Sequence, residues 1–216
     1  MKSIESKIQN EYKKMFSQND WKIFKVGANF YLKNAAFLKK NDIKGDKNVF
    51  QFPIKNSKKN KQLLFRNIQK RLSIGIGCEL LIKSYYLKSG FYINKPIDIK
   101  KNRGAAFLFS ELIEDDINST LTFTFKMLID GLSKLERKLQ GVSVKRIKEI
   151  DNALIIARVF RNKEAHSITN THIYNESDYK KIETGVVEMY SIWFGEELDY
   201  KISFEKGEDK KFEIKR

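Results

Sequence analysis

The hexapeptide from Arg161 to His166 (RNKEAH) combines the side chains of this 216-residue sequence best suited to catalysis. His166 is one of only two histidines, and a histidine can accept or donate a proton near physiological pH. The guanidinium of Arg161 can bind two phosphate oxygens and stabilise the charge that develops on them. Asn162 can orient the histidine or the phosphate. Metal-free RNA cleavage needs a base, an acid and a cation, so this segment offers two of the three parts and an orienting amide.

A helix must position these residues. The apolar residues Ile147, Ile150, Leu154 and Ala157 recur at helical spacing and predict a helix from Val144 to beyond Phe160. The next position on that stripe is Arg161. An arginine directed along a buried face is costly unless it is paired or put to use.

The spacing within the motif sets a geometric condition. Residues five apart on an ideal helix point about 140° apart, so Arg161 and His166 share a face only if the helix loosens or ends between them. Two-fold symmetry is another solution, in which each chain supplies one arginine and one histidine to a shared cleft. Asn162 and His166 are four residues apart and can share a face. Arg158 joins that second stripe as a reserve candidate.

The Arg-x4-His spacing with a polar residue after the arginine resembles the signature of the HEPN superfamily, small all-helical proteins that are often metal-independent RNases. The similarity covers roughly residues 60–195. It implies a homodimer with one composite site, catalytic roles for Arg161, Asn162 and His166, RNA as substrate, and a toxin or antiviral defence role. It implies no metal and no cofactor. Arg158 and Lys163 are the expected further RNA contacts.

One feature departs from part of that superfamily. Toxins that pair with a nucleotidyltransferase antitoxin often carry His-x-Tyr, whereas Ile168 stands two residues after His166. The sequence has His-x-Tyr only at His172-Ile173-Tyr174, in a predicted loop. This departure puts that antitoxin partnership in doubt, although another antitoxin or regulatory partner stays open. The plain structural alternative is that Arg161 caps the helix and His166 is a surface histidine.

The charge balance, 42 Lys and Arg against 27 Asp and Glu, gives a net charge of +15. Such a surface attracts polyanions, so nucleic acid is the first partner to consider. The alternative is that lysine simply decorates the surface of a chain rich in Lys, Asn and Ile. A non-catalytic RNA- or protein-binding module therefore remains the second hypothesis, and a helical scaffold the third.

The single cysteine and the hydropathy pattern exclude several kinds of site and of protein. Cys78 is the only cysteine, so an intrachain disulfide and a cysteine-based zinc site are excluded, and we expect it in the core. The most apolar run, Leu72 to Leu87, contains Glu79 and Lys83 and is not a membrane span. The N-terminus has no apolar signal segment. We therefore expect a cytoplasmic protein without membrane association.

Helical periodicity extends over most of the chain, which has only two prolines. We predict an all-α, HEPN-like bundle with three parts: an N-terminal helical extension over 1–45, a core over 46–195, and a hairpin or tail over 196–216. The predicted helices run over about 3–16, Trp21 to Lys39, Asn60 to Ser89, Asn118 or Ser119 to Leu139, Val144 to beyond Phe160, and Asn175 or Ser177 to Gly195.

Other candidate features have simpler interpretations. The acidic residues between Glu111 and Asp116 are typical of a solvated helix end. Gly75 and Gly77 are wrongly placed for a phosphate loop, and they either break their helix or allow close helix packing. Glu79 and Lys83 have the spacing of an ion pair on one helix face, and Gly90 is positioned to cap that helix.

Overall fold

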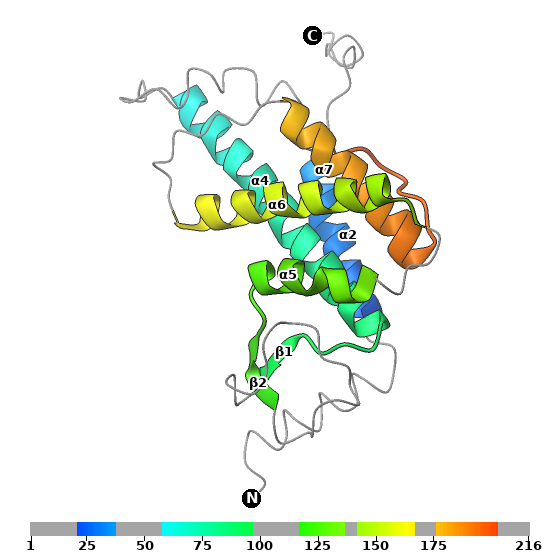
Figure 1. The fold of residues 1–216 in the computed structure, drawn as a ribbon. Helices are drawn as coiled ribbons and strands as arrows, with labels where there is room; N and C mark the ends of the chain where they lie inside the picture. The colour runs from blue at the N-terminus through cyan, green and yellow to red at the C-terminus, as the bar shows by residue number, and fades with distance from the viewer. Residues whose placement is uncertain (1–20, 38–57, 97–116, 137–141, 167–175, 203–216) are drawn as a thin grey trace, which may run out of the picture. The chain divides into compact units, whose positions relative to one another are not determined.

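The computed structural model describes residues 21–37, 58–96, 117–136, 142–166 and 176–202. These residues are mainly helical, which confirms the all-α prediction (Figure 1). The predicted helix over 3–16, the polar segment before residue 58, and the predicted C-terminal hairpin beyond Ile202 lie outside the described residues. The predicted domain boundaries stay predictions. The helices are α2 (Trp21–Phe37), α4 (Lys58–Lys88), α5 (Phe125–Glu136), α6 (Val144–His166) and α7 (Glu176–Met189), followed by a π-helical turn, η3 (Tyr190–Phe194).

The chain divides into two compact units. Unit 1 comprises residues 1–28 and 79–143, and unit 2 comprises residues 29–78 and 144–216. The helices α2 and α4 are each divided between the two units, α2 after Ala28 and α4 after Cys78. No helix within the described ranges is long and apolar enough to cross a bilayer.

Unit 1 contains a small antiparallel sheet that the sequence did not predict. Strand β1 (Asn94–Pro96) pairs with β2 (Ile117–Thr122), with a register shift between the paired ends. The helix predicted from Asn118 or Ser119 therefore begins later, at Phe125, because the segment before it is extended. The Thr124 hydroxyl accepts a 3.3 Å hydrogen bond from the Met127 N–H and so caps the N-terminus of α5.

The end of α4 lies in unit 1 and confirms Gly90 as its cap. Gly90 has a left-handed φ of 81°, and its N–H bonds to the Leu87 carbonyl while the Phe91 N–H bonds to the Tyr86 carbonyl. This pair of bonds is the Schellman motif, and the Tyr86 and Phe91 rings supply its apolar contact at 6.1 Å. The Tyr86 hydroxyl also donates a 2.6 Å bond to the Leu128 carbonyl of α5. The chain reversal after α4 is therefore fixed by local hydrogen bonds and ring packing.

Unit 2 is built on α6, which crosses α4 and lies beside α7 (Figure 1). Glycine allows both contacts. A Cβ on Gly185 of α7 would lie 2.2 Å from the Ala153 Cβ, and one on Gly75 of α4 would lie 2.6 Å from the Arg161 Cβ. The helix α4 continues unbroken through Gly75 and Gly77. The predicted break is wrong, and the predicted role of these glycines in close packing is confirmed for Gly75.

The segment after α7 returns across unit 2. Gly195 ends η3 with a left-handed φ of 69°, as predicted. The Tyr200 hydroxyl donates a 3.2 Å bond to the Asn29 side-chain oxygen, which also accepts a bond from the Tyr190 hydroxyl. At Ile202 the backbone carbonyl accepts a 3.1 Å bond from the buried Lys70 ammonium. Side chains distant in sequence thus hold residues 195–202 in place.

Candidate functional site

The buried face of α6 follows the predicted stripe. Ile150, Leu154 and Ala157 have no exposed surface, and Ile147 is partly exposed. Arg161 continues this stripe and is itself partly exposed. Arg161 therefore lies on the predicted stripe, at the point where the buried face meets solvent.

Arg161 lies against α4 through its backbone and Cβ. A Cβ on Gly75 would come within 2.9 Å of both the Arg161 nitrogen and the Ala157 carbonyl oxygen. The guanidinium extends outward, where Nη1 donates a long 3.4 Å bond to the Asn162 Oδ1 in an exposed setting. An arginine can in this way bury its stem and keep its charged end in water. The base of the side chain is fixed, and its charge is directed to the surface.

Asn162 and Arg158 lie on the outward side of α6. Asn162 is exposed and Arg158 partly exposed. Ile155, which precedes them on the same stripe, is 48% exposed, and burial raises the pKa of the Asp151 carboxyl one turn earlier. The outward stripe thus carries one exposed large apolar side chain next to the polar residues of the motif.

His166 is the last residue of α6. The side chains of Lys163 and His166 lie outside the described residues, so their predicted roles remain predictions. The helix continues without interruption from Val144 to His166, which excludes a helix end between Arg161 and His166. On a regular helix these two residues point about 140° apart. A site shared between two chains therefore stays a prediction.

Two buried cations of α4 lie near the motif, and the sequence interpretation missed them. Lys70 and Arg71 have no exposed surface. The Lys70 ammonium lies 5.7 Å from the Tyr179 ring centre, and that ring packs at 5.5 Å against Phe160, the neighbour of Arg161. Arg71 is four residues before Gly75, the glycine that packs against α6. That spacing puts Arg71 on the same face of α4 as Gly75, but only the tertiary contact identifies this face as the one against α6.

The remaining candidate features are structural or lie outside the described ranges. Glu79 and Lys83 form the predicted ion pair at 3.0 Å. Cys78 is buried as predicted, and burial raises the pKa of its thiol to about 12. Within the described ranges, no group of three or more His, Cys, Asp or Glu side chains is arranged to hold a metal ion. His172 and the acidic residues from Glu111 to Asp116 are not described.

No family model, curated protein or solved structure matches this chain. The functional argument therefore depends on the residues of α6 and their surroundings.

Proposed function

We propose that this protein is a HEPN-type, metal-independent endoribonuclease that works as a homodimer. Its biological role would be that of a toxin or an antiviral defence effector in the cytoplasm. In this proposal residues 46–195 form the HEPN-like core. Arg161, Asn162 and His166 are the catalytic residues, Arg158 and Lys163 are additional RNA contacts, and an antitoxin or other regulatory partner controls the activity.

The observation that supports this proposal best is the setting of Arg161. Its backbone is fixed against Gly75 at the end of the stripe formed by the buried Ile150, Leu154 and Ala157, while its guanidinium reaches solvent beside Asn162. A surface arginine that only caps a helix needs no such fixed base. A fixed base with a solvent-facing charge suits a group that must meet a phosphate in a defined position.

The unbroken helix then favours a shared site. If two α6 helices run antiparallel across a two-fold axis, an axis between Lys163 and Glu164 places each Arg161 level with His166 of the partner subunit. The rise between these residues along one helix is about 7.5 Å, so the two half-sites lie close together. Each half-site would combine one arginine with one histidine from the other chain.

The chemistry follows from these groups. A histidine acting as base removes the proton of the RNA 2′-hydroxyl, and the resulting oxyanion attacks the adjacent phosphorus atom. The Arg161 guanidinium stabilises the charged phosphorane, and Asn162 orients the phosphate or the imidazole. A protonated histidine then donates to the 5′-oxygen that leaves. The products are a 2′,3′-cyclic phosphate and a 5′-hydroxyl.

The test is cleavage of mixed single-stranded RNA in EDTA, with wild type, His166→Ala and Arg161→Ala compared at equal concentration. We expect wild-type cleavage with cyclic phosphate ends and a loss of at least about 100-fold in the His166→Ala protein. His172→Ala is the matched control, because it removes the other histidine, and it should cleave normally. Undiminished cleavage by His166→Ala would rule out the assigned site.

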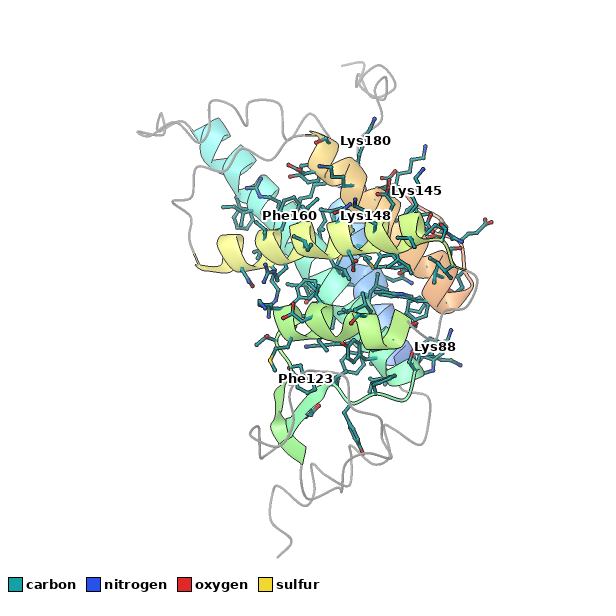
Figure 2. All side chains as sticks on the ribbon, viewed as in Figure 1. Lys88, Phe123, Lys145, Lys148, Phe160 and Lys180 are labelled. Carbon is teal, nitrogen blue, oxygen red and sulfur yellow. The ribbon has the colours of Figure 1, made fainter. Side chains whose placement is uncertain are left out.

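The second candidate function is a non-catalytic RNA- or protein-binding module. Exposed lysines on α6 and α7, among them Lys145, Lys148 and Lys180, favour it (Figure 2). Such a module binds RNA with steep salt dependence and cuts nothing. RNA binding that survives in Arg161→Ala and His166→Ala, without cleavage by wild type, would select this function.

A further inference from the structure

Unit 1 carries a cluster of cations around one aromatic ring. The ammonium groups of Lys22, Lys25 and Lys88 lie 5.7, 6.0 and 5.4 Å from the ring centre of Trp21. Lys22 and Lys88 are exposed, and Trp21 and Lys25 are partly exposed. Lys88 is the last residue of α4 (Figure 2), so the cluster joins residues that are far apart in the sequence.

The scaffold under Trp21 holds this residue in place. The Ser84 hydroxyl of α4 donates a 2.7 Å hydrogen bond to the Trp21 carbonyl at the start of α2, and Ser84 has no exposed surface. Six residues later, a Cβ on Gly27 would lie 3.3 Å from the Leu80 side chain, so α2 and α4 pack closely here. The backbone that carries the indole is therefore anchored to a neighbouring helix, as a binding platform requires.

The chemistry of the cluster selects its ligand. The three ammonium groups contact the indole in cation–π interactions, and together they concentrate positive charge that attracts an anion. A free phosphate would contact only the lysines, whereas the partly exposed indole also offers an aromatic surface. Single-stranded nucleic acid uses both, since an unpaired base stacks on an aromatic ring while cations contact the flanking phosphates. A double helix offers no such base, because its bases are already stacked.

We propose that Trp21, Lys22, Lys25 and Lys88 form a binding site for single-stranded RNA in unit 1. One base stacks on the Trp21 indole, and the three lysines contact the phosphates on either side. This inference rests on the proposed RNA substrate, and it adds a contact site that includes none of the residues of the α6 motif.

Tryptophan fluorescence offers a direct measurement. The protein has two tryptophans; Trp193 is only 2% exposed, so a stacked base should quench Trp21 selectively. We would titrate full-length His166→Ala protein, which keeps the RNA intact, with a mixed 12-nucleotide single strand at low salt. We expect quenching in this protein and its loss in Trp21→Leu, together with about tenfold weaker binding. Trp21→Phe should retain most of the affinity, because it keeps an aromatic ring.

The lysines are tested by charge-matched variants. Replacing Lys22, Lys25 and Lys88 together by Gln should lower the slope of log affinity against log salt by about 2, as expected for three phosphate contacts on a single strand. The control replaces Lys33, Lys126 and Lys201 by Gln, which removes the same charge from exposed sites outside the cluster. It should leave the Trp21 quenching intact. Equal losses in the two triple variants would show general charge attraction and overturn the site.

The outcomes separate this inference from the proposed nuclease. Quenching at Trp21 without cleavage by wild type would support the RNA site and refute the nuclease. Cleavage by wild type, with unchanged RNA binding in Trp21→Leu, would support the nuclease and refute the RNA site at Trp21. Phosphatidylglycerol vesicles are the second probe. If they quench Trp21 and RNA does not, the cluster recognises a membrane surface and the RNA site is wrong.

Discussion

The two units use glycine differently where their helices meet. In unit 2 a Cβ on Gly185 would lie 2.5 Å from the Glu149 carbonyl oxygen, and one on Gly75 would lie 2.9 Å from the Ala157 carbonyl oxygen. In unit 1 the nearest atom to a Cβ on Gly27 is the end of the Leu80 side chain, at 3.3 Å. Backbone cannot move aside without shifting a helix, whereas a leucine side chain can rotate. Contacts on α6 are therefore rigid, and the contact in unit 1 is adaptable.

This difference bears on the two candidate binding regions. Arg161 belongs to the rigid contact, because its own Cβ is the atom nearest to Gly75. The lysines around Trp21 are surface side chains on a packed scaffold. Changes near Arg161 should therefore act through the fold as well as the site, whereas changes to these lysines should act on ligand binding alone.

The largest expected effect comes from Gly185→Ala. The added methyl group would lie 2.2 Å from the Ala153 Cβ, so α6 and α7 must separate. We expect a loss of about 3 kcal/mol of unfolding free energy, since overpacking exceeds the gain of up to about 1 kcal/mol in helix propensity. Urea denaturation followed by circular dichroism measures it. An unchanged midpoint would show that the two helices are not in backbone contact.

A smaller loss, about 2 kcal/mol, is expected for Gly75→Ala, again from overpacking. This variant should also reduce RNA cleavage beyond its effect on the folded fraction, because it displaces the base of Arg161. Gly27→Ala is the matched control and should be neutral or slightly stabilising, since Leu80 can rotate while Ala favours the helix. If Gly27→Ala destabilised as strongly as Gly75→Ala, the contrast between the units would be wrong.

Apart from the substitutions, we expect a decline in stability at alkaline pH. Burial raises the pKa of Cys78 from 9.0 to about 12, and burial likewise raises the pKa of the Tyr190 and Tyr200 hydroxyls. All three belong to unit 2. When the folded-state pKa of a group lies above its unfolded-state pKa, folding favours the protonated form of that group. The stability that the group contributes is complete below its unfolded-state pKa and is lost as the pH rises toward its folded-state pKa. The loss is at most about 1.4 kcal/mol per pH unit for each group.

The measurement is urea denaturation between pH 8 and pH 11, at intervals of about half a unit over the range where these groups titrate in the unfolded chain. Cys78→Ala should flatten the curve by removing one of the three groups, and native Cys78 should resist thiol reagents at pH 8. Rapid labelling of Cys78 under native conditions would contradict its burial.

Periodicity predicted most of the helices, because a helix that packs on one side must repeat its apolar residues at helical spacing. The periodicity located α6, and the glycines that follow periodic segments located the cap at Gly90 and the end of the last helix at Gly195. It failed before α5, where Asn118 and Ser119 resemble helix caps but lie in a strand that pairs with β1. Strand pairing depends on a distant segment, so local cap chemistry could not reveal it.

The sequence by itself determined the buried stripe of α6 and the position of Arg161 at its end, because spacing along one helix is a local property. Only the tertiary structure decided that Gly75 lies against Arg161, that Lys70 and Arg71 are buried near the motif, and that Lys88 meets Trp21. Each of these contacts joins segments separated by dozens of residues. Such contacts arise from the packing of whole helices, which no local pattern of residue types specifies.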